Sequence, residues 1–146
     1  MTPDTFIPDE DMRKQALSCL HYANGFFAAL RSSVENPNSR FDNDLRYNLA
    51  VVCVEKYFVA LLARYDWNAS HHMPVALYRE ALTFDTQLPE SMKKTTILVG
   101  KFEAICSLED FGYRTPTNED LAAMVVGIQE IKEWVEKRVG EIEVFP

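Results

Sequence analysis

The chain has 146 residues, with 15 lysines and arginines against 22 aspartates and glutamates, so its net charge is −7. Hydrophobic residues make up 47% and charged residues 25%, a balance that excludes a disordered, collagen-like or membrane-spanning chain. We expect residues 1–146 to form one domain with a core over about 9–139. The acidic balance argues against broad, non-specific nucleic-acid binding, but it leaves room for a local basic site.

Three cysteines, Cys19, Cys53 and Cys106, lie far apart and form no CxxC pair, which excludes a zinc knuckle or a dithiol redox motif of that kind. We interpret them as reduced core thiols of an intracellular protein. Residues 1–11 hold no basic stretch followed by an apolar run. The sequence therefore predicts no secretory signal and a cytoplasmic location.

The first half of the chain predicts two long helices and a short one. Over about 9–34, apolar residues recur at steps of three and four and so share one face. The second helix, about 41–65, is apolar almost all round from Leu49 to Ala63, which predicts a central, buried position. It is too short and too charged to span a bilayer, so we expect no membrane association. After a loop at 66–70, Ser70 is expected to cap a third helix with Pro74 in its first turns.

The second half predicts two more helices. The fourth covers about 90–109 and a loop follows at 110–116. The fifth opens with a capping box from Thr117 to Asp120 and carries the clearest apolar stripe, which ends at Val139. Five helices with short connections predict an all-α, five-helix antiparallel up-and-down bundle.

Motifs for metal and cofactor chemistry are missing from the sequence. None of the three histidines has a glutamate three residues before it, as a di-iron bundle requires, and no HExxH pattern exists. The five glycines are isolated, which excludes the sequence signal of a phosphate-binding loop. We expect neither a metal nor a cofactor.

The pairing that remains is Arg64 with His71, separated by six residues. If the second helix ends near Tyr65 and the third begins near His71, both side chains lie at one end of the bundle. An arginine there could hold a phosphate bidentately, and a histidine could exchange protons with a ribose hydroxyl, which is sufficient for metal-free RNA cleavage. The alternative is structural: Arg64 serves a helix C-terminus, and His71 or His72 serves the start of the third helix.

Two further patterns concern the surface. Lys93, Lys94 and a basic group in the fifth helix alternate with glutamates, which predicts solvated, salt-bridged helix faces. The sequence places more aromatic side chains on these helices than one narrow helix–helix contact would bury: Phe26, Phe27, Tyr57 and Phe58. Because bundles with two apolar sides often bury the second against another copy, we expect a homodimer.

The segment from Val54 to Ala63 (VEKYFVALLA) resembles the second-helix signature of HEPN (higher eukaryotes and prokaryotes nucleotide-binding) domains, a Glu-Lys pair followed by an apolar run with Ala-Leu-Leu. A short loop, a histidine and spaced leucines follow in that family, as His71 or His72, Leu77 and Leu82 do here. The segment Tyr113 to Pro116 resembles the aromatic-and-proline approach to the family's final helix. The resemblance covers about residues 9–139.

This resemblance implies one of two functions. Some HEPN proteins are metal-independent ribonucleases of toxin or defence type, with an Arg and a His a short spacer apart, and only Arg64 and His71 fit here. In those members a polar residue usually follows the arginine, whereas Tyr65 stands at that position. Other members are dimeric accessory domains that associate with nucleotides, RNA or a nucleotidyltransferase partner.

The departure at Tyr65 favours the accessory group, with Arg64, Asp66, His71 and His72 as the expected binding residues. The ribonuclease using Arg64 and His71 is the first alternative. The second is a purely structural protein-interaction bundle.

Overall fold

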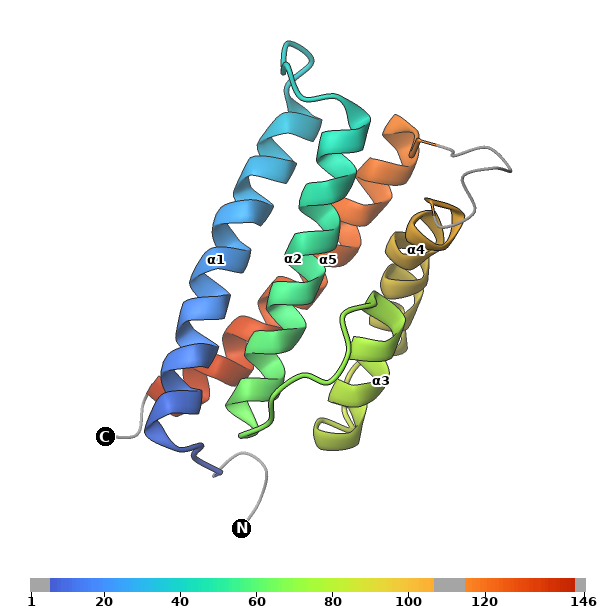
Figure 1. Ribbon diagram of the computed structural model, residues 1–146. Helices are drawn as coiled ribbons and strands as arrows, with labels where there is room; N and C mark the ends of the chain where they lie inside the picture. Colours follow the sequence, from blue (N-terminus) through green and yellow to red (C-terminus); the bar gives the residue numbers. More distant parts are fainter. Residues whose placement is uncertain (1–5, 107–114, 144–146) are drawn as a thin grey trace.

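The computed structural model describes residues 6–106 and 115–143, and within them it holds five α-helices and no strand (Figure 1). The predicted all-α five-helix bundle is thereby confirmed. The helices are α1 (Glu10–Glu35), α2 (Asn43–Arg64), α3 (Pro74–Phe84), α4 (Glu90–Cys106) and α5 (Asn118–Glu143).

Helix α2 lies at the centre and packs against each of the other four helices. The long helices α1, α2 and α5 contact one another, while α3 and α4 pack against each other along one side of this group (Figure 1). Half of the α2 side chains are fully or almost fully buried. This central place was predicted from its apolar residues, because a helix that is apolar on all sides needs neighbours on all sides.

Two tyrosine hydroxyls in the core have hydrogen-bond partners. The Tyr47 hydroxyl donates to the carbonyl oxygen of Val99 at 2.7 Å, and the Tyr57 hydroxyl donates to Oδ1 of Asn24 at 2.7 Å. Cys53 is a free, buried cysteine, as the sequence predicted, and burial raises the pKa of its thiol to about 12. Cys19 is half-buried, and the prediction for Cys106 concerns a side chain outside the described part of the structure.

Side-chain caps fix the starts of three helices. Asp9 accepts from the backbone N–H of Met12 at 2.9 Å, and Asp42 accepts from Leu45 at 2.8 Å. At α5 the predicted capping box is present: Asp120 accepts from the N–H of Thr117 at 2.9 Å, and the Thr117 hydroxyl accepts from the N–H of Asp120 at 3.1 Å. These bonds satisfy N–H groups that the first turn of a helix leaves open.

The third helix differs from the prediction, because α3 begins at Pro74 and Ser70 does not cap it. A proline disfavours helical backbone in the residue before it, so the helix cannot extend toward Ser70 through Met73. The N–H of Ser70 instead donates to the carboxylate of Glu80 at 3.0 Å. Helix α5 runs four residues past the predicted end at Val139, and the predicted end of the fourth helix at Glu109 lies outside the described residues.

Candidate functional site

The chain leaves α2 through a sharp turn at Asp66, whose φ of 63° lies in the left-handed region. Aspartate tolerates this conformation better than most residues do. The turn is held by the N–H of Trp67, which donates to the carbonyl oxygen of Leu62 at 3.0 Å. The Asp66 carboxylate accepts from the backbone N–H of Asp9 at 3.3 Å and so contacts the start of α1. The loop 65–73 therefore begins in a fixed direction toward α3.

Arg64, the last residue of α2, is fully buried, with a relative exposure of 0%. Its Nε donates to the carbonyl oxygen of Arg138 at 3.1 Å, and Nη1 donates to that of Phe6 at 2.9 Å. Nη2 lies 3.3 Å from Oε2 of Glu141, and the guanidinium packs over the Tyr65 ring at 4.8 Å. These contacts attach the end of α2 to α5 and to the N-terminal segment, and they leave no part of the guanidinium open to a phosphate.

His71 lies in a different set of contacts, centred on Glu80 of α3. Nδ1 of His71 is 3.3 Å from Oε1 of Glu80, and the ring is 54% exposed. The same carboxylate accepts from Nε1 of Trp67 at 2.9 Å and from the N–H of Ser70 at 3.0 Å. Burial raises the pKa of Glu80, but these hydrogen bonds outweigh it and hold the pKa below its ordinary value. One ionised carboxylate thus anchors the 65–73 loop to α3.

The four predicted binding residues each have different partners. Arg64 contacts α5, Asp66 contacts Asp9, His71 contacts Glu80, and His72 lies 3.7 Å from Glu55 on α2. The structure therefore brings all four to the end of α2 and the loop after it without joining the Arg64 guanidinium to either imidazole. The part of the predicted pair that faces solvent is His71.

A groove of about 510 Å³ lies beside His71, between the 65–73 loop and α3. It is lined by Trp67, His71, Ala76, Arg79, Glu80, Thr83 and Phe84. Trp67 is 44% exposed, and its indole lies 5.3 Å from the Phe84 ring, centroid to centroid. Arg79 is exposed and makes no hydrogen bond or ion pair with the part of the chain that the structure describes. The groove thus combines an open aromatic surface with an unneutralised guanidinium.

Three of these groove residues, Trp67, Arg79 and Glu80, were missed from the sequence. Trp67 could have been identified, because a tryptophan in a polar loop between helices is often partly exposed and available for binding. Arg79 and Glu80 carried none, since a charged residue on a short helix is usually solvated surface.

Behind the groove, a buried polar cluster connects α3 to α5. Oδ2 of Asp85 accepts from Nε of Arg138 at 2.8 Å and from Nε1 of Trp134 at 2.9 Å. Burial alone raises the pKa of Asp85, but the donors from Arg138 and Trp134 bring it below its ordinary value. Burial and the nearby Asp85 carboxylate raise the pKa of the Tyr65 phenol, which stays protonated. The cluster is a structural support of the loop and the helix ends.

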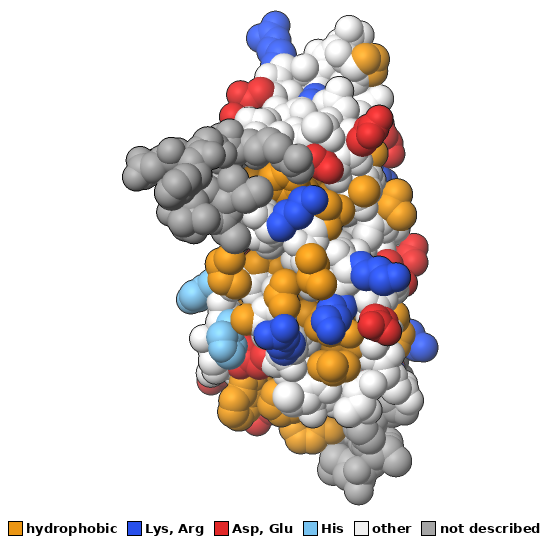
Figure 2. Space-filling view, turned by 90° about the vertical axis from the view of Figure 1, so that its right-hand side faces the viewer, with side chains coloured by type: hydrophobic (Ala, Val, Ile, Leu, Met, Phe, Trp, Pro, Cys, Tyr) orange, Lys and Arg blue, Asp and Glu red, His pale blue; other side chains and the backbone are white. Residues whose placement is uncertain are grey.

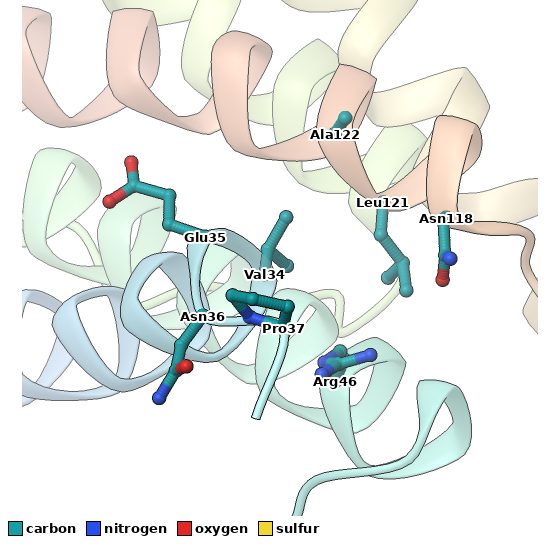
Figure 3. Close-up of a pocket in the computed structure, with 8 residues that line it drawn as sticks. All are labelled: Val34, Glu35, Asn36, Pro37, Arg46, Asn118, Leu121 and Ala122. Carbon is teal, nitrogen blue, oxygen red and sulfur yellow. The ribbon is translucent and has the colours of Figure 1, made fainter. Parts of the chain in front are cut away.

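A second cavity, of about 430 Å³, lies at the other end of the bundle, where α1 ends and α2 and α5 begin (Figure 3). Its lining includes Val34, Pro37 and Leu121 with the polar residues Arg46 and Asn118. Arg46 already donates to Oδ1 of Asn43 at 2.8 Å and to the carbonyl oxygen of Ser33 at 2.9 Å. These bonds give Arg46 a structural role in joining α1 to α2.

No group of three or more metal-ligating side chains is found in residues 6–102 and 115–142, whose side chains the structure describes. In the same residues, none of the helices combines the length and the apolar character needed to cross a bilayer. Comparison with protein-family models, with curated proteins and with solved structures finds no match.

Proposed function

We propose that this chain is a HEPN-like accessory domain that binds a nucleotide or RNA in the groove between the 65–73 loop and α3. The observation that carries the proposal is that one groove holds an exposed indole and the exposed guanidinium of Arg79, which has no hydrogen-bond or ion-pair partner among the described residues. A nucleotide offers both a π-face for the indole and a phosphate for the arginine. The burial of Arg64 favours this binding role over catalysis by the Arg64–His71 pair.

The groove residues have separable roles in this proposal. Trp67 stacks on the base, and Arg79 donates to the phosphate through its planar fork. His71, held by Glu80, presents its imidazole at the rim as a hydrogen-bonding group. Glu80 keeps the groove in shape, because it fixes both the indole and the histidine of the 65–73 loop.

The test is a titration with adenosine monophosphate and with a short single-stranded RNA, followed by tryptophan fluorescence and calorimetry. We expect quenching that Trp67→Phe removes, because Trp134 is half-buried and bonded to Asp85. Arg79→Ala should weaken binding roughly tenfold, the order of one lost charge-assisted contact. Arg40→Ala, an exposed arginine in the α1–α2 connection, is the matched control and should bind as the native chain does.

Absence of binding by the native chain would overturn the nucleotide proposal, as would an equal loss in the Arg79 and Arg40 variants. Far-UV circular dichroism of each variant separates lost contact from lost structure.

We also propose that the domain forms a homodimer. Support comes from exposed apolar side chains on two neighbouring helices, Tyr22 of α1 and Leu45 of α2. Light scattering on the native chain tests the dimer directly. A nucleotidyltransferase or other protein partner stays a prediction of the resemblance.

A further inference from the structure

Helix α4 carries a stripe of three exposed residues, Lys94, Ile97 and Lys101, which we call the α4 stripe. Their spacing of three and four residues places them on one side of the helix. Ile97 is 47% exposed and lies between the two lysines. The stripe is therefore an apolar centre with a positive charge at each end.

The opposite side of α4 packs into the core of the bundle. Met92, Val99 and Phe102 are buried, and α4 packs against α2, α3 and α5. The side of the molecule where α3 and α4 lie shows Lys and Arg side chains interspersed with exposed hydrophobic ones (Figure 2). The α4 stripe thus lies on the side of α4 that faces away from its described contacts with α2, α3 and α5.

Among the side chains that the structure describes, none forms an ion pair with either lysine of the stripe. Lys94 has Glu90 one turn before it, yet neither Lys94 nor Lys101 makes an ion pair with any residue the structure describes. The Lys101 ammonium instead lies 5.2 Å from the centroid of the Phe102 ring. The predicted salt-bridged faces exist on α5, where Lys132 and Glu136 are 2.8 Å apart, but not at Lys94.

We propose that the α4 stripe docks an acidic amphipathic helix of a partner protein. Lys94 and Lys101 are about 10 Å apart along one helix and form no ion pair with a described residue, so they are complementary to carboxylates two turns apart on a facing helix. Ile97 between them fits an apolar residue of that helix, since helix-in-groove recognition combines apolar anchors with flanking charges. An aliphatic centre offers no ring for base stacking, which favours a protein partner over RNA.

This inference is independent of the nucleotide proposal, because none of the three stripe residues lines the groove beside His71. Either proposal can fail while the other holds.

The test uses two synthetic helical peptides that share an apolar face. One flanks that face with glutamates seven residues apart, and the other has lysines at the same positions. Fluorescence anisotropy should show that the acidic peptide binds the native chain and that binding weakens with added salt. The double variant Lys94→Glu/Lys101→Glu should weaken it at least tenfold, and Ile97→Ser severalfold. Lys14→Glu/Lys137→Glu makes the same charge change at exposed sites on α1 and α5 and should leave binding unchanged.

Equal binding of the two peptides would overturn the proposal, as would an equal loss in the two double variants. No binding of the acidic peptide up to about 1 mM, the weakest affinity of interest here, would also overturn it. A single-stranded RNA that binds the native chain, displaces the acidic peptide and loses affinity in the stripe variant would assign the surface to nucleic acid instead. All stripe positions are exposed, and circular dichroism of each variant verifies that the fold persists.

Discussion

At the scale of single residues, the end of α2 is held by charges that the fold has buried. Arg64 and Arg138 both contact Glu141, and Arg138 also contacts Asp85 and the side-chain oxygen of Gln87. Desolvating such groups is costly, and the cost is offset only when almost every donor has an acceptor. The cluster therefore tolerates the loss of one member poorly.

Asp85→Asn is expected to lower the free energy of unfolding at pH 7 by about 3 kcal/mol, at the low end for breaking a buried ion pair because Glu141 still contacts Arg138. Urea denaturation measures the change. Asp11→Asn, at an exposed position in the first turn of α1, is the control and should cost about 0.5 kcal/mol through the helix dipole.

The same aspartate sets part of the acid dependence of stability. Its pKa is lower in the folded chain than in the unfolded chain, where it is about 3.9. Its contribution is therefore complete above the unfolded pKa and is lost as the pH falls through the folded pKa. Between about pH 5 and pH 2, the native chain should lose stability more steeply than Asp85→Asn. Parallel slopes would show that another carboxylate carries the acid transition.

The sequence could single out Arg64 and His71 but not their surroundings. Both are polar residues near a helix end, and their spacing brings them to one region. Which neighbours they meet depends on Glu141, Arg138 and Glu80, which are 77, 74 and 9 residues away along the chain. The spacing between Arg64 and His71 gives no information about which residues from other segments contact them.

At the scale of helices, α4 and α5 approach closely at Gly127. A Cβ added there would collide with the Thr95 side chain and would lie only 2.9 Å from the Thr95 Cβ. Gly25 in α1, by contrast, has nothing within 4 Å of the same added atom. Packing therefore requires a glycine at position 127 and sets no such requirement at position 25.

Gly127→Ala is expected to destabilise the protein by about 1–3 kcal/mol, because overpacking at the α4–α5 contact outweighs the better helix propensity of alanine. Gly25→Ala should stabilise it by up to about 1 kcal/mol, since propensity acts there without a clash. Thermal unfolding of both variants measures the difference. If the two shift the melting temperature in the same direction, α4 and α5 do not meet at this point.

Helices were the most predictable part of the molecule. Periodic apolar residues located all five, and the capping box at Thr117 fixed the start of α5. The error at the start of α3 arose because a possible cap at Ser70 was given more weight than the backbone restriction from Pro74. The periodicity of apolar residues does not show which helix faces meet, so contacts such as Thr95 with Gly127 could not be predicted from the sequence.

At the scale of the whole molecule, the buried polar cluster and the open groove lie in different parts of the bundle. The buried cluster around Asp85 and Arg138 braces one end, while the 65–73 loop and α3 form an open groove over it. Packing around α2 holds the remaining helices in place. We propose that this groove is the binding site and that the role of Arg64 is structural.

The most direct measurement is an RNA cleavage and binding assay in EDTA, with the native chain, His71→Ala and Arg64→Lys, each checked by light scattering and circular dichroism. We expect the folded native chain to bind RNA without cleaving it. We also expect Arg64→Lys to lower stability, because a lysine cannot reproduce the three contacts of the guanidinium. Cleavage by the native chain that is lost in folded His71→Ala and Arg64→Lys would contradict the account and identify a ribonuclease.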